Sequence, residues 1–131
     1  MSEMTNVAVC GAHMSGLPLN DQLLKLGGRL VKATTTSPDY RMYHLSEFQP
    51  ARPGMLRVAQ GGVPIALEVW ELPLSQYGAF VATIPAPLGI GRVELQDGTW
   101  VQGFVCESYA VERAQDISAY GGWRQFLLAV K

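Results

Sequence analysis

Residues 7–16, VAVCGAHMSG, lead an apolar run into a glycine turn that holds His13, one of two histidines in the chain. An imidazole titrates near neutral pH, so a histidine fixed in such a turn can serve as an acid in catalysis. The alternative is a ring that is satisfied by backbone groups of the turn and does no chemistry. The residues alone leave both interpretations open.

Charged side chains offer further candidates. Arg41 could hold a carboxylate through two hydrogen bonds, or it could be an exposed strand residue. Neighbours on a strand face opposite sides, so Tyr40 and Arg41 cannot both enter one pocket, and Arg41 is the better candidate. Glu71 and Glu107 could form a carboxylate pair, but each is expected to pair with an arginine at a strand end.

The cysteines and histidines do not predict a metal site. Cys10 and Cys106 lie in apolar runs, where a cysteine is usually a small buried hydrophobe. Neither their spacing nor that of the two distant histidines matches a set of metal ligands. We therefore expect no disulfide, no metal and no cofactor.

The elements around the turn can be read from local signals. Residues 7–10 are typical of a buried strand, and a two-turn helix is expected after them. Asn20 is predicted as its N-cap, Leu19 and Leu24 as a hydrophobic staple, and Gly27 as its stop. The turn is thus expected between a strand and a capped helix.

The remaining chain alternates between short apolar runs and Pro or Gly breaks. It predicts strands over 29–36, 40–45, 55–59 and 63–72, a helix that begins with Pro73 at its first position, a hairpin of 90–95 and 100–107 around Asp97-Gly98, and a last short helix within 119–128. The fold class is α+β, with about seven strands and three helices, and the sheet is expected to be mixed and curled into a small barrel.

Composition restricts the partners. We expect one domain over residues 7–131 after an N-terminal extension of residues 1–6. The net charge is −1 and there is no Lys/Arg run, which argues against nucleic acid and anionic membranes as partners. Neither a membrane span nor a signal peptide is recognisable, so a cytoplasmic protein is expected.

Residues 10–24 resemble a segment of a known superfamily. Cys10-Gly11-Ala12-His13, followed by Gly16, Asn20 and a Leu-Leu pair, is similar to the strand, turn and helix of γ-glutamylcyclotransferase-like proteins. The resemblance implies that the turn offers backbone N–H groups to a substrate carboxylate, as glycine turns before helices can do. Ile84 stands where cyclotransferases carry their catalytic glutamate. γ-Glutamylcyclotransferase activity is therefore not expected.

A second resemblance extends over about residues 7–128. The motifs GAHxSGxPLN, PDYRxY, VWELP, IPAPLGIG, GFxCE and DIxxYGGWR together resemble the C-terminal domain of allophanate hydrolase. That resemblance implies a small γ-glutamylcyclotransferase-like β-barrel. In allophanate hydrolase an amidase domain makes N-carboxycarbamate, and the C-terminal domain is implicated in converting it to carbamate and CO2. The amidase part is missing here, and the start at Met1 favours a free-standing homologue.

The resemblance also implies roles for single residues. His13 would be the acid catalyst, and a small urea-derived carboxylate would be bound by Gly11, Ala12, His13, Asn20 and Arg41. The IPAPLGIG segment is expected to form a pocket wall or an interface, and Arg124 with Trp123 to lock the last helix to the barrel.

Two classes of function remain. One is a decarboxylase. The other is a non-catalytic accessory or oligomerisation module that partners a separately encoded amidase. A homodimer is the default expectation for either.

Overall fold

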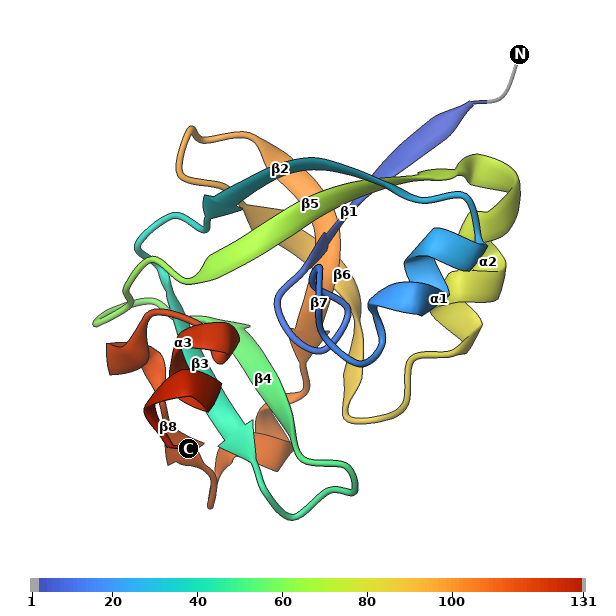
Figure 1. The fold of residues 1–131 in the computed structure, drawn as a ribbon. Coiled ribbons are helices and arrows are strands. Elements are labelled where there is room, and N and C mark those ends of the chain that lie inside the picture. The colour runs from blue at the N-terminus through green and yellow to red at the C-terminus, as the bar shows by residue number, and fades with distance from the viewer. Residues whose placement is uncertain (1–2, 131) are drawn as a thin grey trace.

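The computed structural model describes residues 3–130, which form eight strands in two sheets with three α-helices and two 3-10 turns (Figure 1). The elements in chain order are β1 Met4–Val9, α1 Asn20–Lys25, β2 Arg29–Thr35, β3 Tyr40–Leu45, β4 Arg52–Arg57, β5 Ala66–Pro73, α2 Leu74–Ala82, β6 Leu88–Glu94, β7 Trp100–Cys106, η1 Ser108–Val111, β8 Gln115–Asp116, η2 Ser118–Tyr120 and α3 Trp123–Ala129. The predicted α+β class is confirmed.

The larger sheet has five strands in the order β2-β5-β1-β7-β6, with β1 in the middle (Figure 1). β1 runs antiparallel to β5 and parallel to β7. Its residues 7–9 are fully buried, as expected for a strand covered on both faces. The strand begins earlier than predicted, because residues 4–6 of the expected extension pair with residues 71–73. Residues 1 and 2 lie outside the described part.

The five-stranded sheet closes on itself at one corner. An antiparallel bridge joins Thr36, just after β2, to Leu95, just after β6. The N–H of Ser37 donates to the carbonyl of Glu94 at 2.9 Å, and that of Gln96 to Thr35 at 3.0 Å. These bonds connect the two outermost strands, which makes the mixed sheet a small barrel.

A second sheet, β4-β3-β8, lies against one end of the barrel. A Cβ atom added to Gly54 would stand 2.8 Å from the Sγ of Cys106, so β4 packs directly on the end of β7. β4 covers residues 52–57 instead of the predicted 55–59. β8 was not predicted, since its two residues form a strand only through their pairing with β3.

Local signals correctly located the end of α1 and the turn of the last hairpin. Gly27 ends α1 with φ of 88°, and the N–H groups of Gly27 and Gly28 donate to the carbonyls of Leu24 and Leu23, the pattern of a Schellman motif. The hairpin at Asp97-Gly98 is also confirmed, with Gly98 at φ of 86°.

Three details at helix ends differ from the prediction. Asn20 is not the N-cap of α1, because Leu19 occupies that position without a side-chain hydrogen bond, and both leucines of the expected staple are exposed. Pro73 ends β5 in an extended conformation and caps α2 instead of opening it. The last helix is divided into η2 and α3 by Gly121 and Gly122. No helix within residues 3–130 is long and apolar enough to cross a membrane.

Candidate functional site

A cavity of about 230 Å³ opens where the turn after β1, the start of β4 and the segment between α2 and β6 meet. It is lined by Val9, Cys10, Gly11, Ala12, His13, Leu19, Pro50, Ala51, Arg52, Pro53, Met55, Thr83, Pro85, Leu88, Phe104 and Val105. Most of this wall is apolar. Of the predicted site residues, the structure brings Gly11, Ala12 and His13 to the cavity.

His13 is held in place by three elements. Its side chain is buried, and its Nε2 lies 2.9 Å from the amide oxygen of Gln22 on α1. The ring contacts Phe80 of α2 edge-on, at a centroid distance of 5.3 Å, and Phe104 of β7 at 5.2 Å. An amide oxygen can only accept, so the proton of the neutral ring is on Nε2. Nδ1 is then the nitrogen left to exchange a proton with a bound molecule.

Burial lowers the pKa of His13 below its usual 6.5, although the hydrogen bond with Gln22 opposes part of this shift. Removal from water penalises the charged imidazolium more than the neutral ring. The free protein therefore holds His13 neutral at neutral pH.

The backbone carbonyl groups and the backbone N–H groups of the turn differ in their hydrogen bonding. The carbonyls of Gly11, Ala12 and His13 each accept a hydrogen bond, from the N–H of Met14 at 3.0 Å, the N–H of Leu19 at 2.9 Å and the side-chain amide of Asn20 at 2.8 Å. Within residues 3–130 the N–H groups of the same three residues donate to no protein acceptor. Consecutive free N–H groups can bind an anion.

Asn20 stabilises the turn without lining the cavity. It is buried and does not line the cavity, and its amide donates to the carbonyl of His13. Its position at the first residue of α1 explains this bond, because the side chain points back along the chain toward the turn. Asn20 thus supports the predicted site without facing it.

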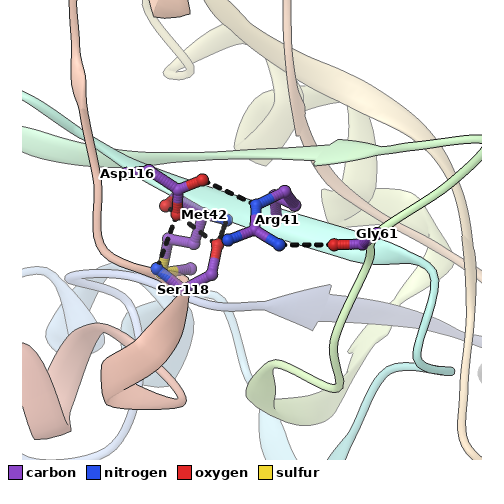
Figure 2. Close-up of polar contacts among 5 residues, drawn as sticks. All are labelled: Arg41, Met42, Gly61, Asp116 and Ser118. Atoms are coloured by element: carbon purple, nitrogen blue, oxygen red, sulfur yellow. Dashed lines mark hydrogen bonds and ion pairs between the residues drawn. The ribbon is translucent and has the colours of Figure 1, made fainter.

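Arg41 does not line the cavity and instead contacts Asp116 and Gly61 (Figure 2). Its Nε donates to Asp116 at 2.6 Å, and a terminal nitrogen donates to the carbonyl of Gly61. Asp116 also accepts the N–H of Ser118 at 2.9 Å (Figure 2). The cause is the unpredicted strand β8, which pairs with β3 and supplies the carboxylate that engages Arg41. The structure does not bring Arg41 to Gly11–His13.

Sequence reasoning missed Arg52, the charged side chain among the residues that line the cavity. Arg52 begins β4, and its Nε donates to the carbonyl of Pro50 at 2.9 Å. Nothing in the local sequence distinguishes it from other surface arginines. Only the packing of β4 on the turn after β1 shows where it lies.

A buried carboxylate anchors the far end of the same loop. Glu68 of β5 accepts the N–H and hydroxyl of Ser15, at 2.8 and 2.7 Å, and the indole N–H of Trp70 at 2.9 Å. Arg124 lies 3.6 Å from Glu68 and donates to the carbonyl of Ser15 at 2.6 Å. Arg124 therefore ties α3 to this loop, which agrees with the locking role predicted for it.

The environment of Glu68 keeps it ionised. Burial acts to raise its pKa, but the hydrogen bonds from Trp70 and Ser15, together with Arg124, outweigh it, so the pKa lies below its usual value. Glu71, by contrast, forms the ion pair predicted at a strand end, with Arg29. Glu107 is exposed and has no ion pair within residues 3–130.

The other predicted features of the wall can now be placed. Pro85 and Leu88 of the IPAPLGIG segment line the cavity, as expected for a pocket wall. Ile84 packs against the core, and the absence of cyclotransferase activity stays a prediction.

Both cysteines are free and buried. Burial raises the pKa of Cys10 to about 12 and that of Cys106 to about 11, so neither is a ready nucleophile. Residues 3–130 contain no cluster of three or more candidate metal ligands.

The closed mixed sheet, with a donor-rich turn after its central strand, defines a small α+β barrel domain. The same fold is found in the protein PH0828 of Pyrococcus horikoshii, which is 19% identical with a TM-score of 0.70, over 96% of this chain and 95% of that one. Residues 5–128 match the family model of the allophanate hydrolase C-terminal domain, and the chain belongs to that family.

Known relatives differ in how much surrounds this domain. The chain is 40% identical to urea amidolyase of Saccharomyces cerevisiae, over 99% of its own length and 7% of that protein. The crystallised allophanate hydrolase of Kluyveromyces lactis is 38% identical with a TM-score of 0.94, over 98% of this chain and 22% of that one. The protein c4763, described as specific to uropathogenic E. coli, is 36% identical with a TM-score of 0.88, over 95% of this chain and 96% of that one.

Proposed function

We propose that this domain binds a small urea-derived dicarboxylate at the Gly11–His13 turn and promotes its decarboxylation, with N-carboxycarbamate as the substrate. The observation that carries the proposal is the pairing of three free N–H groups with a buried histidine at one apolar cavity. Its kinship with proteins named allophanate hydrolase and urea amidolyase supports a urea-derived substrate.

The proposed reaction needs a place for each carboxylate. The retained carboxylate accepts hydrogen bonds from the turn, which fixes one end of the substrate. The leaving carboxylate occupies the rest of the cavity, whose mostly apolar wall accommodates the uncharged CO2 once it has formed. The C–N bond breaks, its electron pair stays on nitrogen, and a proton from His13 completes the carbamate. Water then returns a proton to His13.

The low pKa of His13 fits this sequence of events. The ring is neutral in the free protein because it is buried. A bound dianion favours the imidazolium, since an opposite charge nearby raises the pKa of a histidine. Substrate binding thereby favours the protonated form of His13, which is the acid in the reaction.

The test couples a purified amidase that makes N-carboxycarbamate to this protein and follows CO2 release. His13→Asn keeps a hydrogen-bonding side chain but loses the proton, so it should lose most of the acceleration, about 10²–10⁴-fold for a positioned acid. The matched control is His44→Asn. His44 packs against Trp123 and Phe126 outside the cavity, and its loss should leave the rate unchanged.

Two results would contradict the proposal. If the wild type does not accelerate CO2 release over the amidase alone, the domain is not a decarboxylase, and the accessory-module function takes its place. If His13→Asn accelerates release as well as the wild type, the domain is catalytic but His13 is not its acid.

A further inference from the structure

We infer that Arg52 binds the second carboxylate of the ligand and makes the cavity selective for dicarboxylates over monocarboxylates. This inference rests on the proposed function, since it assumes that a first carboxylate occupies the Gly11–His13 turn. It adds a residue that neither the motifs nor the comparisons single out.

The first support is the position of Arg52. The start of β4 lies directly on the turn, because a Cβ atom added to Gly11 would stand only 2.8 Å from Cγ of Pro53. Arg52 precedes that proline and lines the same cavity as Gly11, Ala12 and His13. The turn residues with the free N–H groups and Arg52 therefore line one cavity, and only a glycine at position 11 permits this close approach of β4.

The second support is the way the side chain is held. Its Nε is bonded to the carbonyl of Pro50, and its guanidinium carbon lies 5.8 Å from the centre of the Phe48 ring. Within residues 3–130 its terminal nitrogens have neither a hydrogen-bond acceptor nor an ion-pair partner. Arg29, Arg41 and Arg124, by contrast, are each engaged by a carboxylate. Arg52 is thus partly ordered while its forked donors stay available.

The third support is the charge of the cavity. Among its described lining residues there is no Asp or Glu, so nothing there neutralises Arg52. A ligand with one carboxylate satisfies the turn but leaves the guanidinium without a partner. A ligand with two carboxylates satisfies both, and the second contact is a charge-assisted hydrogen bond.

Arg52 is expected to contribute to substrate binding and not to the rate of the chemical step. The carboxylate that faces it loses its charge as CO2 forms, so Arg52 stabilises the bound substrate more than the transition state. Loss of Arg52 should therefore raise KM and leave kcat unchanged or higher. This split separates Arg52, a binding residue, from His13, whose loss should lower kcat.

The test is calorimetric titration with malonate and with its half-amide malonamate, which has nearly the same shape but one carboxylate. The wild type should bind malonate about 10–100-fold more tightly, the usual value of a hydrogen bond to a charged group. Arg52→Gln should abolish this preference and leave malonamate affinity within about twofold. Arg92→Gln, an exposed arginine of β6 outside the cavity, should behave as the wild type.

The outcomes are distinguishable. If Arg52→Gln keeps the preference for malonate, the inference is overturned while the carboxylate site at the turn stands. If the wild type binds both probes equally, the inference is overturned in the same way. If the wild type binds neither probe, the proposed function and the inference both fail.

Discussion

Two buried titratable side chains border the same loop, and their surroundings fix opposite charge states. Burial keeps His13 neutral, and the hydrogen bond to the amide oxygen of Gln22 opposes this only in part. Glu68 is equally hidden, yet hydrogen bonds from Trp70 and Ser15 keep it ionised. The neutral ring of His13 can be protonated when an anionic ligand binds. The carboxylate of Glu68 is already ionised, and its hydrogen bonds hold the loop in place. We therefore assign the chemistry to His13 and the support of the loop to Glu68.

The pH dependence of the reaction should report His13. The acid form is the protonated ring, so kcat/KM for CO2 release should fall as pH rises through the pKa of His13 in the free protein, below 6.5. The fall of kcat should occur at higher pH, because the bound dianion raises that pKa. Measuring both parameters between pH 5 and 8 checks this. A flat kcat/KM over that range would contradict the acid role.

Glu68→Gln should destabilise the fold by about 1–3 kcal/mol at pH 7, because a buried, fully bonded charge is lost. The matched control is Glu71→Gln on the same strand, whose partner Arg29 is exposed and whose loss should cost less than about 1 kcal/mol. Urea unfolding gives both values.

The effect of Glu68→Gln should also depend on pH. The pKa of Glu68 is lowered in the folded state, so its contribution is complete above its ordinary value of 4.5 and is lost as pH falls through the folded value. The gap between wild type and variant should therefore shrink in acid. A gap that stays constant down to pH 3 would show that charge is not its cause.

At the scale of the element, glycine positions are the most informative residues. Gly27→Ala should cost about 1–2 kcal/mol, because its φ of 88° is unfavourable for a residue with a Cβ atom. Gly78→Ala is the matched control within helix α2, where an added Cβ meets nothing within 4 Å. It should stabilise the protein by about 0.5–1 kcal/mol. Thermal unfolding of the two variants should move in opposite directions.

Elements defined by neighbouring residues could be predicted from the sequence. The stop of α1 at Gly27 and the hairpin at Gly98 depend on the residues beside them, and both are confirmed. β8 and the first half of β1 could not be predicted, since they are strands only because distant segments pair with them. The burial of Glu68 on β5 has the same origin, because Ser15 and Arg124, which contact its carboxylate, come from distant segments of the chain.

The candidate site likewise has a part that the sequence predicts and a part that it does not. Gly11, Ala12 and His13 are consecutive, so one motif places all three at the cavity. The choice between Arg41 and Arg52 is not local. It depends on Asp116, which lies 75 residues after Arg41 and engages it, and on the contact of β4 with the turn. A single sequence does not contain either fact in a readable form.

For the molecule as a whole, one buried hydroxyl supports the backbone at the point where the barrel closes. The Oγ1 of Thr36 donates to the carbonyl of Ser37 at 2.7 Å and accepts the N–H of Ile65 at 3.0 Å. Thr36→Val keeps the shape but leaves that N–H without a partner, so it should cost about 1–3 kcal/mol. Thr34→Val, half-buried earlier on β2, is the matched control and should change stability by less than about 0.5 kcal/mol.

Denaturant titrations of both threonine variants would test this. The dependence of free energy on urea should be unchanged, because the same surface is exposed on unfolding. Equal stability of Thr36→Val and wild type would show that the hydroxyl is dispensable for closure.

The central position of β1 affects when the larger sheet can form during synthesis. Within this domain it is the first strand to be synthesised, yet Ala8 lies beside Gly103, so its parallel neighbour is made only after most of the other strands of the domain. Until then residues 7–9 have a free edge, and the sheet cannot be completed. Proteins dominated by such distant pairings fold in milliseconds to seconds rather than microseconds. The donor-rich turn that follows β1 is therefore encoded early in the domain but takes shape only when most of the domain has been made.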